Sequence, residues 1–74
     1  MMKGRKITVD ITNIQKHQTE EGQEMVFIEI LNRYTVIVSP ILYRQVKNLL
    51  SVGATINLTG RMVQGKILAS EITA

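Results

Sequence analysis

The part of this 74-residue chain that says most about its structure is SPILYRQVKNLLSVG, which occupies residues 39–53. Ser39 suits a helix N-cap because its hydroxyl accepts a hydrogen bond from a first-turn amide, and Pro40 suits the first helical position, where no amide hydrogen is needed. One apolar stripe follows at helical spacing, made of Leu42, Val46, Leu49 and Leu50. Gly53 can supply the left-handed residue that ends a helix. The stretch therefore predicts one helix over about residues 40–51.

Strand-like patterns lie on both sides of this helix. They cover about residues 5–15, 24–31 and 34–38 before it, and about 54–63 and 66–72 after it. In the first strand Ile14 falls out of the apolar alternation, which predicts a bulge near Thr12-Asn13. Gly60 interrupts the fourth strand and indicates a bulge or a barrel corner. Polar residues 16–22 form a predicted loop, while Asn32-Arg33 and Gln64-Gly65 are predicted tight turns.

The resulting element order is three strands, one helix and two strands, which is the order of a five-stranded OB barrel. We therefore predict an all-β fold with a single domain over residues 1–74. A domain of this size buries only roughly 60% of the surface of its unfolded chain, so its own core leaves little surplus stability. The chain has no cysteine and hence no disulfide. We expect a homo-oligomer, because a second subunit can add the missing buried area.

Several functional classes are not expected from this composition. Without cysteine, the single His17 cannot build a zinc site, and we expect no metal and no other cofactor. Asp10 and Glu29 lie in predicted strands, but no nucleophile or phosphate loop accompanies them, so we expect no catalytic residues and no enzyme. The apolar runs are too short to span a bilayer, and the basic start is followed by no apolar signal region. We expect a cytoplasmic protein without a membrane partner.

The charges are unevenly distributed along the chain. Glu20, Glu21 and Glu24 gather in and directly after one predicted loop, so the rest of the chain carries nine basic against three acidic side chains. A basic surface outside this loop would suit phosphate groups, although an ordinary solvated surface would also give this balance.

Three stretches carry a resemblance to a known family: MVFIEILN at 25–32, YTVIV at 34–38 and GATINLTGR at 53–61. They resemble the second, third and fourth strands of OB-fold nucleic-acid-binding domains, such as the anticodon-binding domains of class II aminoacyl-tRNA synthetases. In that family a phenylalanine of the second strand stands on the outer barrel face and stacks on a base, and Phe27 matches it. The resemblance implies single-stranded nucleic acid, DNA or RNA, as the partner.

The aromatic residues leave alternatives open at this stage. If Val26 and Ile28 face the core, strand alternation puts Phe27 outside, where it could stack on a base or contact another subunit; a shifted alternation would put it in the core. Tyr34 shares the face of Phe27 if the preceding turn has two residues, and points inward if the turn is longer.

Four cations complete the predicted binding site, because they lie at strand ends and turns where flexible side chains can reach phosphates. They are Arg33, Arg61, Lys66 and Lys16. The leading hypothesis is therefore a protein that binds single-stranded nucleic acid on the outer face of its second and third strands. The alternative is a protein-interaction or assembly module whose subunit interface uses the same face, through Met25, Phe27, Leu31 and Val36.

Overall fold

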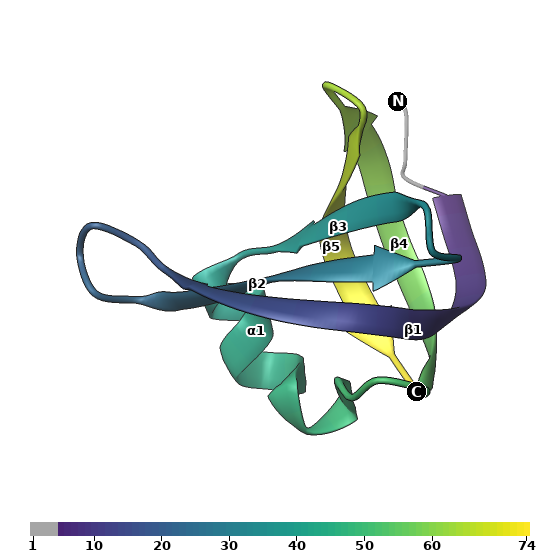
Figure 1. Ribbon diagram of the computed structural model, residues 1–74, viewed down its shortest axis with the longest axis horizontal. Helices are drawn as coiled ribbons and strands as arrows, with labels where there is room; N and C mark the ends of the chain where they lie inside the picture. Colours follow the sequence, from purple (N-terminus) through teal and green to yellow (C-terminus); the bar gives the residue numbers. More distant parts are fainter. Residues whose placement is uncertain (1–4) are drawn as a thin grey trace.

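A computed structural model describes residues 5–74, with Arg5 described through its backbone only. Of the basic start of the sequence, residues 1–4 lie outside the described residues. The elements are β1 (Arg5–Gln18), β2 (Glu24–Ile30), β3 (Tyr34–Val38), α1 (Pro40–Val46), the 3-10 turn η1 (Lys47–Leu49), β4 (Thr55–Val63) and β5 (Lys66–Thr73). Figure 1 shows α1 below the strands and the β1–β2 hairpin reaching out to one side.

The five strands form a closed barrel in the order β1-β2-β3-β5-β4. All neighbours are antiparallel except β3 and β5, which pair in parallel through only two positions, Val36 with Ile67 and Ile37 with Leu68. This arrangement confirms the predicted all-β, OB-like barrel with its single α-helix between the third and fourth strands.

β1 takes part in both halves of the barrel because it bends in the middle. Residues 5–10 pair with β4, and residues 11–18 pair with β2 after a register shift between Ile11 and Asn13. This confirms the predicted bulge. The extra residue, Thr12, uses its hydroxyl twice: it donates to the Glu29 carbonyl oxygen at 3.0 Å and accepts from the Asn32 amide at 3.3 Å. The bend is thereby tied to the turn that follows β2.

The register between β4 and β5 shifts at Gly60, as predicted, and the extra residue is Ser70 on β5. A Cβ at this position would lie 2.6 Å from the Leu68 carbonyl oxygen and 3.0 Å from Ile67 Cγ2. Only glycine therefore lets the two strands approach this closely.

The helix begins as predicted but ends earlier. Ser39 caps it by accepting from the Leu42 amide at 3.3 Å. The α-helical turns stop at Val46, and one 3-10 turn carries the chain to Leu49. Gly53 does have a positive φ of 91°. It lies in the turn into β4, where its amide donates to the Ile11 carbonyl at 2.8 Å, so it starts a strand instead of ending the helix.

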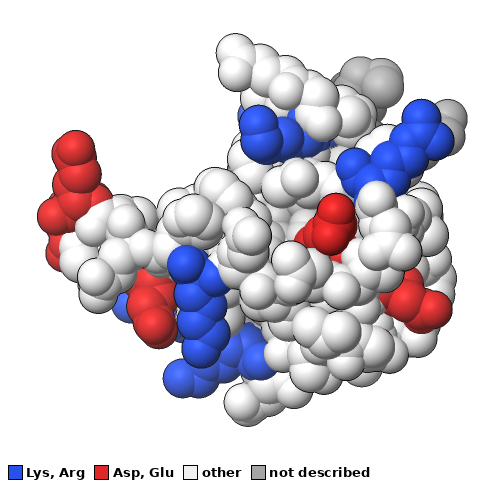
Figure 2. Space-filling view, in the orientation of Figure 1, with Lys and Arg blue, Asp and Glu red and all other residues white. Residues whose placement is uncertain are grey.

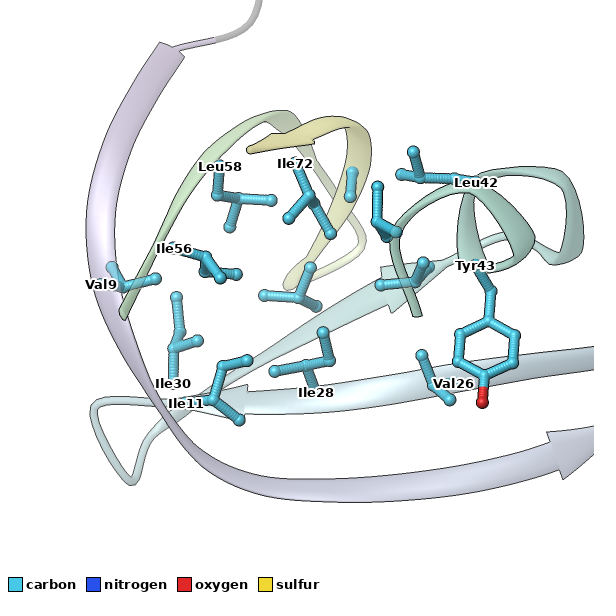
Figure 3. Close-up of a cluster of buried hydrophobic side chains, with 14 residues drawn as sticks. Val9, Ile11, Val26, Ile28, Ile30, Leu42, Tyr43, Ile56, Leu58 and Ile72 are labelled. Carbon is cyan, nitrogen blue, oxygen red and sulfur yellow. The ribbon is translucent and has the colours of Figure 1, made fainter. Parts of the chain in front are cut away.

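The core fills the barrel and the space between the barrel and α1. Its members are Val9, Ile11, Val26, Ile28, Ile30, Val36, Val38, Leu42, Tyr43, Val46, Ile56, Leu58, Ala69 and Ile72. Figure 3 shows the core side chains pointing inward and the Tyr43 ring at one end of the cluster, beside Val26. Since alternate residues of β2 and β3 are buried, the residues between them must stand on the outer surface.

Candidate functional site

One row of paired side chains runs around the outside of the barrel, with one residue from each strand. Residues that pair directly share a face, and the registers join Gln15 to Phe27, Phe27 to Ile37, Ile37 to Leu68, and Leu68 to Arg61. The three central members are half-buried and the two end members are exposed. We call these five residues the outer row: an apolar centre with a polar residue at one end and a cation at the other.

Phe27 stands at the centre of this face with a second aromatic ring beside it. Its neighbours Val26 and Ile28 are fully buried, and Phe27 itself is half-buried on the opposite side of β2, which excludes a place in the core. The imidazole of His17 lies 4.3 Å from the phenyl ring, measured between centroids, with the planes 37° apart. The two rings form a tilted stack on the projecting hairpin.

A shallow hollow of about 270 Å³ opens beside Phe27. It is lined by Asn13, Gln15, Phe27, Ile28, Glu29, Thr35 and Lys66. A second row of paired residues, Asn13, Glu29 and Thr35, runs parallel to the outer row and supplies most of the polar lining. The hollow is below the roughly 300–1,000 Å³ of sites for drug-sized ligands, so it suits a group the size of one ring system.

Of the two places considered for Tyr34, the structure shows the inward one and not the place beside Phe27, because the turn before β3 is longer than two residues. Ile30 pairs with Tyr34, so residues 31–33 make the connection and Tyr34 shares the inward face of the buried Ile30. Leu31 and Asn32 both have positive φ, 56° and 51°, the signature of a type I′ turn. Arg33 is the third residue of the connection, after the two turn residues. Its amide donates to the Ile30 carbonyl at 3.0 Å.

The four predicted cations do not gather at one place. Lys66 lines the hollow, and Arg61 ends the outer row. Arg33 lies over the ring of Tyr34, with 5.3 Å between its guanidinium carbon and the ring centroid. Lys16 lies in β1, where a loop was predicted, because the pairing of β1 with β2 continues past the barrel. Lys16 pairs with the buried Val26, so its side chain projects from the side away from Phe27.

The acidic residues at and beside the β1–β2 loop, Glu20, Glu21 and Glu24, lie apart from Lys66 and Arg61, whereas Glu29 shares the hollow with Lys66. Figure 2 shows acidic atoms at the far end of the β1–β2 loop and basic atoms beside the β4–β5 hairpin. Asp10 is held by the Thr55 hydroxyl at 2.5 Å in the β1–β4 pair, whereas Glu29 lies on the β1–β2–β3 surface. The two strand carboxylates considered for acid–base chemistry are thus on different parts of the barrel.

The predicted subunit-interface residues are also separated. Met25 pairs with His17 and shares the face of Phe27. Leu31 is exposed on the turn, and Val36 is buried in the core at 1% exposure, so Val36 is not available to a partner.

Sequence reasoning missed several members of this face, among them His17, Glu29 as a binding group, Ile37 and Leu68. The alternation of YTVIV could have placed Ile37 outside together with Phe27. His17 lies on this face because β1 continues three residues beyond its expected end, which no local pattern indicates. The phase of the fifth strand is ambiguous in the sequence, and only the pairing of Ile37 with Leu68 resolves it.

Comparisons with known proteins add no family. No family model matches this chain, and no curated protein or solved structure matches it significantly. Within residues 5–74, no helix is both long and apolar enough to cross a membrane. The described part of the chain also contains no group of three or more His, Cys, Asp or Glu side chains placed to hold a metal ion.

Proposed function

We propose that this protein binds single-stranded nucleic acid across the outer face of β1, β2 and β3. The observation that carries the proposal is the outer row, in which Phe27, Ile37 and Leu68 present a continuous apolar strip that ends at Arg61. Bases stack on such surfaces with little regard to sequence, and one aromatic contact contributes roughly 1–3 kcal/mol.

The charges beside the strip support this ligand. Lys66 and Arg61 lie toward the β4–β5 hairpin, where they can contact phosphates without leaving water. Glu20 and Glu21 lie at the tip of the β1–β2 loop, where they would repel phosphates. A bound strand would therefore keep its backbone on the β4–β5 side and its bases over Phe27.

The test is fluorescence anisotropy with a labelled pyrimidine oligonucleotide over a range of salt concentrations. With two phosphate contacts, log Kd should change with log salt with a slope of magnitude about 1.4, from about 0.7 per contact. Phe27→Ala should weaken binding by about 1–3 kcal/mol and leave this slope unchanged, because stacking releases no counterions.

A matched control is Ile41→Ala. Ile41 is an apolar side chain on α1 with 64% exposure, away from the outer row, and its truncation should leave binding unchanged. Circular dichroism of both variants confirms that the barrel is intact. If the wild type does not bind the oligonucleotide even at 50 mM salt, the proposal is wrong.

A second candidate function is subunit assembly through the same strip, and it is favoured by the apolar character of Phe27, Ile37 and Leu68 in a chain with a small core. This arrangement would place Glu29 in the interface, so it requires a cation from the other subunit to pair with that carboxylate. Light scattering over a dilution series distinguishes the two candidates. A stable dimer that Phe27→Ala converts to a folded 8.3 kDa monomer, together with no oligonucleotide binding, would establish the assembly function.

A further inference from the structure

The unusual residue of the candidate site is Glu29. It is half-buried at the centre of β2, between Asn13 on β1 and Thr35 on β3. None of the side-chain hydrogen bonds among residues 6–74 uses its carboxylate; only its backbone carbonyl is engaged, by Thr12. A carboxylate in this position would oppose a nucleic-acid ligand unless the ligand offers it hydrogen-bond donors.

Phosphates offer no donors, so a strand bound here must turn a base edge toward Glu29. The hollow has the arrangement this requires: Phe27 on one side to stack on the base, Glu29 and its paired neighbours on the other, and Lys66 nearby for the adjoining phosphate. Phe27 and Glu29 are two residues apart on one strand, about 7 Å along it, which is a distance one base can bridge.

The four bases differ in what they present to a carboxylate. The Watson–Crick edge of guanine carries two adjacent donors, N1–H and the N2 amino group, which match the two carboxylate oxygens. Cytosine and adenine each present one amino donor beside an acceptor. Thymine and uracil present a single N3–H between two carbonyl oxygens, and those oxygens would face the carboxylate.

We infer that the hollow between Phe27 and Glu29 is a base-reading pocket that selects guanine and rejects thymine and uracil. Glu29 accepts from guanine N1–H and N2–H while the ring stacks on Phe27. The inference rests on the proposed function, since it assigns a preferred base to the same face.

The experiment compares three DNA heptamers that differ only at the central base: all thymine, one central guanine, and one central inosine. A bidentate contact discriminates by about tenfold or more, so the guanine heptamer should bind at least about ten times more tightly than the thymine heptamer. Inosine lacks the N2 amino group and should fall between them. This arm changes only the ligand, so it does not depend on the folding of a variant.

The protein arm uses Glu29→Gln, with Glu71→Gln as its control. Glu71 is exposed on β5, paired with Thr59 outside the hollow, and the control makes the same change in net charge. A glutamine amide can both donate and accept, which matches thymine better than guanine. Glu29→Gln should therefore abolish or reverse the preference for guanine, while Glu71→Gln should keep it.

The outcomes separate the two claims. If all three heptamers bind equally tightly, or if Glu29→Gln keeps the guanine preference, the base-reading inference is overturned and the proposed function stands. If none of the heptamers binds at 50 mM salt, the proposed function fails and the inference fails with it.

Discussion

The barrel has two register shifts, one between β1 and β2 and one between β4 and β5, and they differ in the residues that form them. β1 bends at Thr12, whose hydroxyl fills the gap by bonding to both the Glu29 carbonyl and the Asn32 amide. Between β4 and β5 the extra residue is Ser70 on β5, whose hydroxyl donates to the Thr59 carbonyl at 3.1 Å. The absence of a side chain at the neighbouring Gly60 lets β4 approach the Leu68 carbonyl. Both register shifts therefore use the hydroxyl of their extra residue, but only the second also requires a glycine, so the two should respond differently to mutation.

The largest effect is expected from Gly60→Ala. The added Cβ would lie 2.6 Å from a backbone oxygen, which cannot move without shifting β5. We expect the free energy of unfolding to fall by about 2–3 kcal/mol, measured by urea denaturation followed by circular dichroism. The control is Gly22→Ala, where φ is 85° but no atom lies within 4 Å, and a loss of about 1 kcal/mol is expected from conformation alone. Equal losses in the two variants would show that contact at Gly60 is unimportant.

Thr12→Val should have a smaller effect. The substitution keeps the shape and removes two hydrogen bonds, which together contribute about 1–2 kcal/mol to the free energy of unfolding. Thr8→Val removes an exposed hydroxyl that donates to Asn57, and it should change stability by less than about 0.5 kcal/mol. A Thr12→Val protein as stable as the wild type would mean that strand pairing alone sets the bend in β1.

The β1–β2 hairpin ends in acidic residues, whereas the β4–β5 hairpin carries cations. Two lysines test this difference in charge. Lys66 lies in the hollow, whereas Lys16 projects from the other side of the β1–β2 hairpin. Lys66→Gln should reduce the magnitude of the salt slope of oligonucleotide binding by about 0.7, and Lys16→Gln should leave it unchanged. The reverse result would place the backbone of the ligand on the helix side of the hairpin.

The smallest effect concerns the acidic tip. Replacing both Glu20 and Glu21 by Gln should tighten oligonucleotide binding by about twofold at 50 mM salt, because it removes repulsion from exposed charges. The gain should disappear at 200 mM salt, where exposed charges more than about a Debye length apart are screened. A gain that persists at high salt would indicate a direct contact of the tip with the ligand.

The barrel could be predicted because its signals are local. The cap at Ser39, the out-of-phase Ile14 and the glycine at position 60 each specify the backbone within a few residues, and together they define the element order. The candidate site depends on register instead. One additional residue in the turn before β3 moves Tyr34 from the outer face to the inner one. The continuation of β1 past the barrel places Lys16 on the side away from Phe27 and brings His17 next to Phe27. Register is fixed by pairing between distant strands, which a single sequence does not display.

The two-position pairing of β3 with β5 has a consequence for how the molecule opens. If Val36 separates from Ile67 and Ile37 from Leu68, the barrel unrolls into a fully antiparallel sheet in the order β3-β2-β1-β4-β5, and no other strand pair is broken. The free edges of that sheet are β3, with its β-branched YTVIV sequence, and β5. Unpaired edges of this kind pair readily with the same edges of other chains. Two ladder positions, the packing of α1 against β5 and the buried core inside the barrel together keep these edges from pairing with other chains.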